Sequence, residues 1–301
     1  MIKSFDEIIS KVKSSSLKTV AVAVAQDEPV LEAVRDAKKN GIANAILVGD
    51  KDEISKIADD LKMDLADFEI VDIKDPIEAA LKAVELVSSK KADILMKGLI
   101  DTKNFLKSVL NREVGLRTGN LMSHVAVFET EAFDRLIFLT DVAFNTFPDL
   151  DQKAQIINNA VKVARAIGYE EPKVACVCAV EVVNPNMPNT VDAEALTKLN
   201  ADGVIANCTV QGPLSLDIAL SEEAAHHKNV QGEVAGKADI LLLPNIESGN
   251  IMYKTLTYFT NPKNGGILVG TSAPVVLTSR ADSYETKMYS IALAALSCDL
   301  Q

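Results

Sequence analysis

Ser279 and Arg280, near the C-terminus, are the side chains best suited to chemistry in this sequence. They follow an apolar stretch that predicts the end of a strand, and open parallel sheets bind ligands outside the carboxyl ends of their strands. The hydroxyl and the guanidinium both donate hydrogen bonds, so together they suit a phosphate-like anion. Asp282 and Glu285 follow closely and could accept a proton. The segment therefore predicts an anion site with a base beside it.

The same segment also has a purely structural interpretation, in which it is the start of a helix. Ser279 or Asp282 would then cap the helix, and Glu285 would lie in the first turn, where the helix dipole favours a carboxylate. These residues alone leave both interpretations open.

A second candidate anion site lies in the first third of the chain. Lys97 closes an expected strand, Gly98 would let a ligand approach the backbone, and Thr102 opens a helix. Free N–H groups at a helix N-terminus favour an anion, and the long side chain of Lys107 could reach back to it. A capped amphipathic helix with solvated lysines explains the same pattern.

Two further segments place polar residues after expected strands. Asp141 and Asn145 follow one strand, where a polar side chain is either a turn former or a ligand contact. Gly249 and Asn250 open a helix after another strand, so that the glycine permits close approach and the amide can donate and accept. Simple capping by Ser248 is an equally good interpretation of this second segment.

The composition excludes several classes of protein. With 301 residues, 48% of them hydrophobic and 24% charged, the chain can build a full core. Its formal net charge of −11 argues against nucleic acid and anionic membranes as partners. No segment reaches the roughly 18 apolar residues that a membrane span needs, and the N-terminal segment is not a secretion signal. We therefore expect a cytoplasmic protein.

Metal ligands are not grouped in the sequence. The four cysteines are scattered in apolar surroundings without a C-x-x-C pair, so we expect buried reduced thiols and no metal site. The chain also has neither the Gly-x-Gly-x-x-Gly turn of dinucleotide-binding proteins nor the phosphate loop that ends in Gly-Lys-Ser/Thr.

Strand-like apolar runs alternate with helix-like segments along the chain, which is typical of a largely parallel sheet covered on both faces. Residues 203–208 are predicted to form one of the strands, and Gly212-Pro213 is predicted to form a turn. A turn-rich junction at 145–148 predicts two α/β domains, with the border near residues 141–145. Because a cleft between two domains is a frequent location for a ligand site, we expect the polar strand ends of both domains to meet there.

As an ordered set, several segments resemble the phosphate acyltransferase family, which has acetyl- and butyryl-transferring branches. The resemblance extends over nearly the whole chain, and the stretches MKGLIDT and LTSRADS are more similar to the butyryl branch. It rests on residues 102–110, 141–145, 232–236, 237–244, 247–253 and 278–280.

The resemblance implies a two-domain, three-layer α/β/α fold like that of the isocitrate and isopropylmalate dehydrogenases. The first domain would hold residues 1–140 and 272–301, with residues 141–271 inserted as the second domain and the active site in the inter-domain cleft. The implied reaction is butyryl-CoA + phosphate = butyryl phosphate + CoA, with coenzyme A and phosphate as substrates and no cofactor. A homodimer or a multiple of dimers is also implied.

Residue by residue, the resemblance assigns phosphate binding and transition-state stabilisation to Ser279 and Arg280. Lys107 falls where the acetyl branch has a phosphate-binding arginine, so a point charge would replace a planar fork. The acetyl branch's catalytic aspartate corresponds to Thr286 in this sequence. Glu285 or Asp282 would then be the base, unless the step needs little help from a base.

In the implied mechanism, the coenzyme A thiol attacks the carbonyl carbon of butyryl phosphate. Asn145 or a backbone N–H would polarise the carbonyl oxygen. Lys97, Thr102, Gly249 and Asn250 are expected to contact the substrates.

Three alternatives stay open. One is a phosphate acetyltransferase of the same family. Another is a metal- and NAD(P)-dependent hydroxyacid dehydrogenase of the same architecture, which would need a cluster of aspartates for its ion. The third is a non-catalytic protein that binds acyl-CoA, an option kept open by Thr286 at the acidic position.

Overall fold

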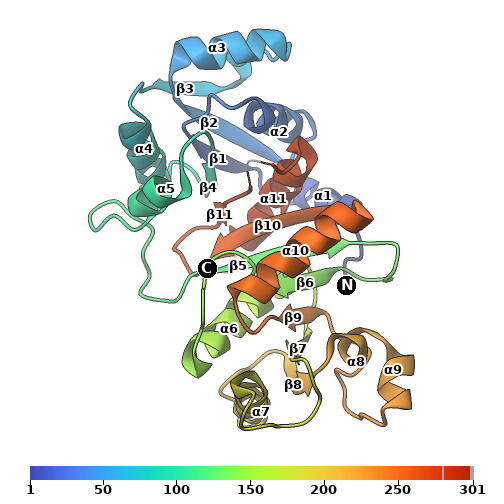
Figure 1. Ribbon diagram of the computed structural model, residues 1–301. Helices are drawn as coiled ribbons and strands as arrows, with labels where there is room; N and C mark the ends of the chain where they lie inside the picture. The colour runs from blue at the N-terminus through green and yellow to red at the C-terminus, as the bar shows by residue number, and fades with distance from the viewer. Residues whose placement is uncertain (280, 299–301) are drawn as a thin grey trace. The chain divides into compact units, whose positions relative to one another are not determined.

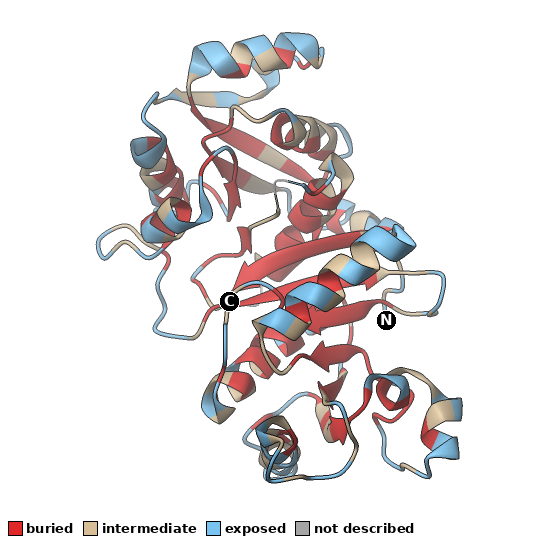
Figure 2. Cartoon of the chain, viewed as in Figure 1, coloured by how far each residue is buried: buried red, intermediate tan, exposed pale blue. Residues whose placement is uncertain are grey.

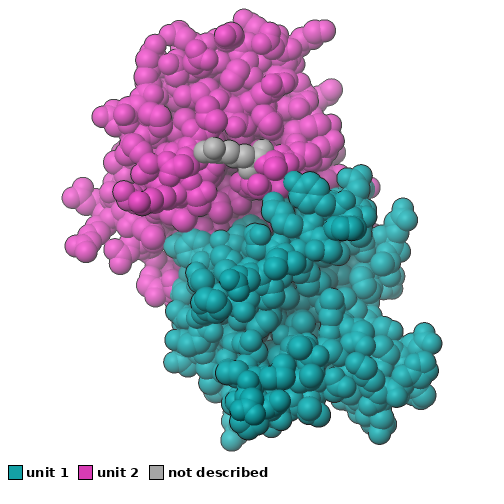
Figure 3. Space-filling model, viewed as in Figure 1, with its two compact units in different colours: residues 1–4, 121–264 teal, residues 5–120, 265–301 magenta. Residues whose placement is uncertain are grey.

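The computed structural model describes residues 1–279 and 281–298. The chain forms two compact units, coloured separately in Figure 3. Unit 1 comprises Met1–Ser4 and Leu121–Asn264, and unit 2 comprises Phe5–Asn120 and Gly265–Gln301. The domain limits expected from the sequence, 1–140 with 272–301 and 141–271, stay a prediction.

The strands of unit 2 follow the order β3-β2-β1-β4-β11-β10. β1 pairs in parallel with β2 and β4, and β11 continues the parallel array beside β4, whereas β10 is antiparallel to β11. β4 is buried throughout, as expected for a strand covered on both faces. The strands are β1 (Lys18–Ala23), β2 (Ala43–Gly49), β3 (Glu69–Asp72), β4 (Ile94–Lys97), β10 (Lys263–Val269, which crosses the unit boundary) and β11 (Val275–Val276).

Aspartates that follow strands or loops begin several helices of unit 2. The side chains of Asp27, Asp50, Asp75 and Asp101 accept hydrogen bonds from backbone N–H groups at the starts of α2, α3, α4 and α5. The last helix, α11, packs against α1 and α2 and is buried along most of its length (Figure 1). The helices are α1 (Phe5–Lys13), α2 (Glu28–Lys39), α3 (Lys51–Asp60), α4 (Pro76–Ser88), α5 (Thr102–Val109) and α11 (Tyr284–Ser297), with a 3₁₀ turn at Leu65–Asp67.

The strands of unit 1 follow the order β5-β6-β9-β7-β8. β5 and β6 are antiparallel, whereas β6, β9, β7 and β8 are parallel to one another. The carboxyl ends of β6, β9, β7 and β8 therefore lie at one edge of the sheet. The strands are β5 (Ser123–Glu129), β6 (Ile137–Thr140), β7 (Lys173–Val177), β8 (Thr209–Leu214) and β9 (Ile240–Leu242).

Helix α10 is the most exposed long helix of unit 1, as its pale outer face shows in Figure 2. Its inner side is buried at Gly249 and Tyr253, and the Tyr253 ring packs edge-on against Phe128 of β5 with ring centroids 5.5 Å apart. The helices are α6 (Leu150–Ala166), α7 (Pro188–Ala201), α8 (Leu216–Leu220), α9 (Glu222–His227) and α10 (Ile246–Thr260). In the described part of the chain, no helix is long and apolar enough to cross a membrane.

Two local predictions in this region are wrong. Residues 203–208 form turns and bends, and the strand is β8, which contains the Gly212-Pro213 pair that was expected to be a turn. β8 ends the strand order of unit 1, where a proline without an N–H is tolerated. A side chain at Gly212 would come within 2.6 Å of the Cys176 Cβ, so this glycine serves packing between β8 and β7.

Candidate active site

The carboxyl ends of three parallel strands meet at one edge of the unit 2 sheet. Ala23 at the end of β1 is level with Lys97 at the end of β4, and Val276 at the end of β11 is level with Met96. The segment that follows β11 and leads to Ser279 therefore starts at the same edge as Lys97 (Figure 1). Parallel α/β sheets bind ligands at this edge.

The segment Ser279–Asp282 is closed by its own hydrogen bonds. The Ser279 amide donates to Asp282 Oδ2 at 2.7 Å, and the Asp282 amide donates to the Ser279 carbonyl at 3.2 Å. Ser279 Oγ accepts a hydrogen bond from the Ala281 amide at 3.3 Å. Asp282 is buried and its carboxylate stabilises this turn. Arg280, the other half of the predicted anion-binding pair, lies outside the described residues.

Lys287 is a residue of this site that sequence reasoning missed. It is only 3% exposed, and its Nζ donates to the carbonyl oxygens of Ser279 at 3.0 Å and Asp282 at 2.9 Å. Burial lowers the pKa of Lys287, whereas the nearby Asp282 and Asp27 carboxylates act to raise it. The signal in the sequence was a lysine in the first turn of a helix, where acidic side chains are favoured.

Helix α11 is capped by Ser283, and not by Ser279 or Asp282 as the structural interpretation of the segment expected. The Ser283 hydroxyl accepts a hydrogen bond from the Thr286 amide at 3.2 Å. Glu285 does lie in the first turn and is half-buried. A hydrogen bond between the Tyr284 hydroxyl and Glu285 raises the pKa of that tyrosine.

Gly98 is required by the protein's own backbone. A side chain at Gly98 would come within 2.2 Å of the Val24 carbonyl oxygen, which also accepts a 2.7 Å hydrogen bond from the Leu99 amide. Lys97 is 6% exposed, and its Nζ donates to the Gly98 carbonyl at 3.3 Å. The loop after β4 is therefore packed directly on the loop after β1.

The N-terminus of α5 already holds a carboxylate. Asp101 accepts hydrogen bonds from the Asn104 amide at 2.9 Å and from its side-chain Nδ2 at 2.6 Å, and these bonds lower the pKa of Asp101. Thr102, the first residue of α5, and Lys107, near its end, are both exposed. Their predicted contacts with substrate stay predictions, and the carboxylate of Asp101 disfavours a second anion directly on this helix start.

In unit 1, the loop after β6 is organised around a buried carboxylate. Asp141 is 3% exposed and accepts hydrogen bonds from the amides of Ala143, Phe144 and Asn145 at 2.9, 3.0 and 3.1 Å. Asn145 Nδ2 donates to Asp141 Oδ2 at 2.6 Å and to the Met122 carbonyl at 2.8 Å. Because a side-chain amide has two hydrogens, Asn145 has no further hydrogen to donate to a substrate carbonyl in this arrangement.

The start of α10 rests on that same loop. A side chain at Gly249 would come within 2.1 Å of the Asp141 carbonyl oxygen, and Asn250 Nδ2 donates to the Val142 carbonyl at 3.3 Å. The capping residue is Asn245, whose side chain accepts a hydrogen bond from the Ser248 amide at 3.0 Å, so capping by Ser248 is wrong. The predicted substrate contacts of Gly249 and Asn250 stay predictions.

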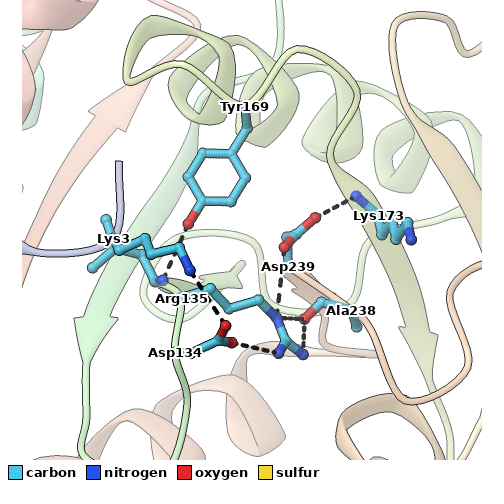
Figure 4. A network of polar contacts seen from close by, with 8 residues as sticks. Lys3, Asp134, Arg135, Tyr169, Lys173, Ala238 and Asp239 are labelled. Atoms are coloured by element: carbon cyan, nitrogen blue, oxygen red, sulfur yellow. Dashed lines mark hydrogen bonds and ion pairs between the residues drawn. The ribbon is translucent and has the colours of Figure 1, made fainter. Parts of the chain in front are cut away.

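A separate polar network lies at the opposite, amino-terminal edge of the unit 1 sheet (Figure 4). Arg135 donates twice to the Ala238 carbonyl, at 3.2 and 3.1 Å, and lies 3.6 Å from Asp239. Asp239 accepts a hydrogen bond from the Lys173 amide at 2.9 Å, and burial raises the pKa of Asp239. These groups lie at the amino ends of β6, β9 and β7, so they brace the sheet away from the candidate site.

Across residues 1–279 and 281–298, no group of three or more His, Cys, Asp or Glu side chains is placed to hold a metal ion. The candidate residues form two sets, one in each unit, and each set follows the carboxyl ends of parallel strands. The predicted location of the active site between the domains stays a prediction.

Comparison with known proteins identifies relatives over nearly the whole chain. Residues 4–79 and 74–295 match the family described as phosphate acetyl/butaryl transferase. A phosphate butyryltransferase of Clostridium acetobutylicum is 74% identical over 296 residues, which cover 98% of each chain.

Solved structures give the same picture of the fold. The crystal structure of a branched-chain phosphotransacylase from Enterococcus faecalis matches with a TM-score of 0.84 and 38% identity, over 95% of this chain and 100% of that one. A 4-hydroxythreonine-4-phosphate dehydrogenase from Klebsiella pneumoniae has a TM-score of 0.56 and 13% identity, over 94% of this chain and 100% of the other, which indicates a shared fold alone. The predicted dehydrogenase-like α/β fold class is therefore confirmed.

Proposed function

The chain belongs to the phosphate acetyl/butaryl transferase family, and from that premise we propose that it catalyses butyryl-CoA + phosphate = butyryl phosphate + CoA. It is an acyltransferase. The observation that carries this assignment is the 74% identity with a phosphate butyryltransferase over nearly the full length of the chain. The acetyltransferase alternative is less favoured, because the relative at 74% identity is a butyryltransferase.

In this proposal, Ser279 and Arg280 bind the phosphoryl group. The contacts of Ser279 support its part, because its oxygen accepts a hydrogen bond from Ala281 while, among the described residues, its hydroxyl hydrogen has no acceptor. That hydrogen is available to a phosphate oxygen. The part of Arg280 comes from the family resemblance, with the guanidinium fork offsetting charge on the phosphate as it leaves.

We assign the two candidate bases different roles. Asp282 is buried and its carboxylate accepts the Ser279 amide, so it holds the turn. Glu285 is half-buried in the first turn of α11 and is the better proton acceptor for a substrate that arrives from solvent. Proton transfer to a positioned carboxylate contributes about 10²–10⁴-fold to catalysis.

The chemistry is a direct acyl transfer. The coenzyme A thiol gives its proton to Glu285, and the sulfur attacks the carbonyl carbon of butyryl phosphate. As the C–S bond forms, the C–O bond to the phosphate breaks, and the phosphate leaves with the electron pair. No covalent enzyme intermediate is needed, because a thiolate is already a strong nucleophile.

The acyl oxygen carries negative charge in the transition state and needs a hydrogen-bond donor, which is worth ~3 kcal/mol. The hydrogens of the Asn145 amide are already donated to Asp141 and Met122, so a backbone N–H is the better donor. Lys97, Thr102, Lys107, Gly249 and Asn250 are proposed to line the substrate path, where alignment of two substrates supplies much of the rate.

We also propose that the reaction needs neither metal nor nucleotide, that the protein is cytoplasmic, and that it forms a homodimer or a multiple of dimers. These three statements come from the sequence and the family resemblance. Light scattering coupled to gel filtration would measure the oligomeric state directly.

The decisive experiment is an acyl-chain panel. Acetyl-, propionyl-, butyryl- and isobutyryl-CoA are each mixed with phosphate, without metal or nucleotide, and release of coenzyme A is followed. We expect phosphate-dependent release with the highest kcat/KM for a four-carbon chain. A highest kcat/KM for acetyl-CoA would establish the acetyltransferase alternative.

Two other outcomes would reject catalysis of this kind. Tight coenzyme A binding with no turnover would favour the non-catalytic alternative. Activity that requires magnesium and NAD would favour the dehydrogenase.

Arg280→Ala should lower kcat by at least about 10²-fold without unfolding the protein, because it removes a charged donor to the leaving phosphate. Near-normal turnover in that variant would remove Arg280 from the mechanism.

A further inference from the structure

We infer that Lys287 is a positioning residue for phosphate: its ammonium group holds together the two backbone carbonyls that flank the Ser279 turn, and so fixes the Ser279 hydroxyl where phosphate binds. This inference rests on the proposed function, because the phosphate role of Ser279 belongs to that proposal. Lys287 itself would not touch the substrate.

The contacts define a clamp with two sides. On one side, Lys287 Nζ donates to the Ser279 and Asp282 carbonyls at 3.0 and 2.9 Å. On the other, the Asp282 carboxylate accepts the Ser279 amide at 2.7 Å. The turn is thus held through both backbone groups of Ser279, which fixes the point from which its side chain extends, and the Ala281 amide donates to its Oγ at 3.3 Å. A short rigid anchor of this kind suits a group that must meet a substrate with sub-ångström precision.

The cost of placing an ammonium group here indicates that its charge is used. Lys287 is 3% exposed and lies in the first turn of α11, so both burial and the helix dipole disfavour a cation. The carboxylates of Asp282 and Asp27 compensate in part. An apolar side chain of similar length would fill the space without this cost, and buried charges are often replaced by apolar groups without loss of stability.

Loss of the clamp has a specific consequence. Without Lys287 Nζ, the Ser279 and Asp282 carbonyls lose their hydrogen-bond donor and must be hydrated instead. The turn can then leave its present conformation. Phosphate binding then weakens more than coenzyme A thioester binding, because Ser279 serves phosphate in the proposed site. A lysine that only stabilised the fold would affect both substrates alike.

The experiment compares Lys287→Met with Lys287→Arg and with a matched control, Lys153→Met. Lys153 is also a buried lysine, 4% exposed, and it donates to Asn189 Oδ1 at 2.9 Å and Asp192 Oδ2 at 2.6 Å in unit 1. For each folded variant, KM for phosphate and KM for butyryl-CoA are measured in the direction that forms butyryl phosphate, together with Tm.

Lys287→Met is expected to raise KM for phosphate by about 10- to 100-fold, the loss typical of a hydrogen-bonded charge, with less than about threefold change in KM for butyryl-CoA. Lys287→Arg keeps a cation with several donors and should recover part of the loss. Lys153→Met should lower Tm while leaving the ratio of the two KM values close to that of the wild type.

The ratio of the two KM values decides the question in whichever position-287 variant folds. An unchanged ratio in an active, folded variant overturns the role of Lys287 while leaving the acyltransferase function standing. A ratio that rises equally in Lys153→Met also overturns it, because the effect is then one of general stability. Absence of activity in the wild type is a different result, which rejects the proposed function itself.

Discussion

At the residue scale, the polar side chains that follow the strands bind mainly to the protein's own backbone. Asp101 accepts from Asn104 at the start of α5, Asp141 binds the amides of its own loop, and Asp282 binds the Ser279 amide. From the sequence alone, Asp282 was open to interpretation as a base and Asp141 as a ligand contact. Because Asp282 is buried and already accepts the Ser279 amide, Glu285 is the more accessible of the two candidate bases.

The roles assigned to Glu285 and Asp282 make different predictions. Glu285→Gln should lower kcat by about 10²-fold or more near neutral pH, because the thiol loses its proton acceptor. The loss should shrink as pH approaches the thiol's own pKa, since free thiolate then supplies the nucleophile. Asp282→Asn should instead raise KM for phosphate, because it weakens the bond that orients Ser279. Steady-state kinetics from about pH 6 to 9 would measure both. Equal pH profiles for the two variants would contradict this division of roles.

Cys178 gives a prediction that depends on pH. It follows β7, its sulfur donates to the Asn189 carbonyl at 3.4 Å, and burial raises the pKa of its thiol to about 11. A thiol is alkylated through its thiolate, so reaction with iodoacetamide should be slow at neutral pH and should rise about tenfold per pH unit up to about pH 11. Mass spectrometry of the Cys178 peptide measures the extent of its alkylation, and free coenzyme A in the same tube serves as the unburied thiol for comparison. Half-maximal reactivity near pH 8.5 would show that burial does not control this cysteine.

At the element scale, two glycines that suggested ligand approach allow elements of the chain to approach each other. Gly98 lets the loop after β4 meet Val24 after β1, and Gly249 lets α10 meet Asp141 after β6. Val24 itself has a φ of 59°, which is unusual for a β-branched residue and marks backbone strain beside the candidate site. Close backbone packing therefore builds the carboxyl edges from which the functional groups extend.

Gly249→Ala tests this packing. The added methyl group would lie 2.1 Å from the Asp141 carbonyl oxygen, which is backbone and cannot move aside cheaply. We expect a loss of about 1–3 kcal/mol in the free energy of unfolding, together with lower kcat/KM because the 141–145 loop shifts. Urea denaturation measures the first. Asn250→Ala, at the exposed neighbouring position, should change stability by less than about 0.5 kcal/mol and serves as the control. Equal stability of the two variants would refute the packing role.

At the scale of the whole molecule, unit 2 is completed by the end of the chain. β11 lies between β4 and β10, and α11 packs against α1 and α2. The buried face of α11 includes Ile291, Leu293 and Leu296. A fragment ending at residue 120 would lack these elements and expose the surfaces that they cover.

This arrangement predicts how fragments behave. Residues 121–264 contain β5–β9 and α6–α10, so this fragment should unfold cooperatively in urea when followed by circular dichroism. Residues 5–120 alone should show no cooperative transition, because too little apolar surface is buried. Joining residues 265–301 to that fragment through a flexible linker should restore the transition. A cooperative transition in residues 5–120 alone would contradict the need for the C-terminal segment.

Local signals determined much of this protein from the sequence by itself. The alternation of strands and helices and the ordered segments shared with phosphate acyltransferases both depend on neighbouring residues or on motif order. The fold class and the family followed from them. Only the tertiary structure decided which groups meet across long stretches of chain, such as Gly249 with Asp141. It also decided that Pro213 lies within an edge strand. The partners of Lys287 were hidden for a different reason: they lie close in the sequence, but only the path of the turn brings their carbonyls onto one buried ammonium group. Hydrogen bonding and burial depend on such placement in space, and the order of residue types along a chain does not contain it.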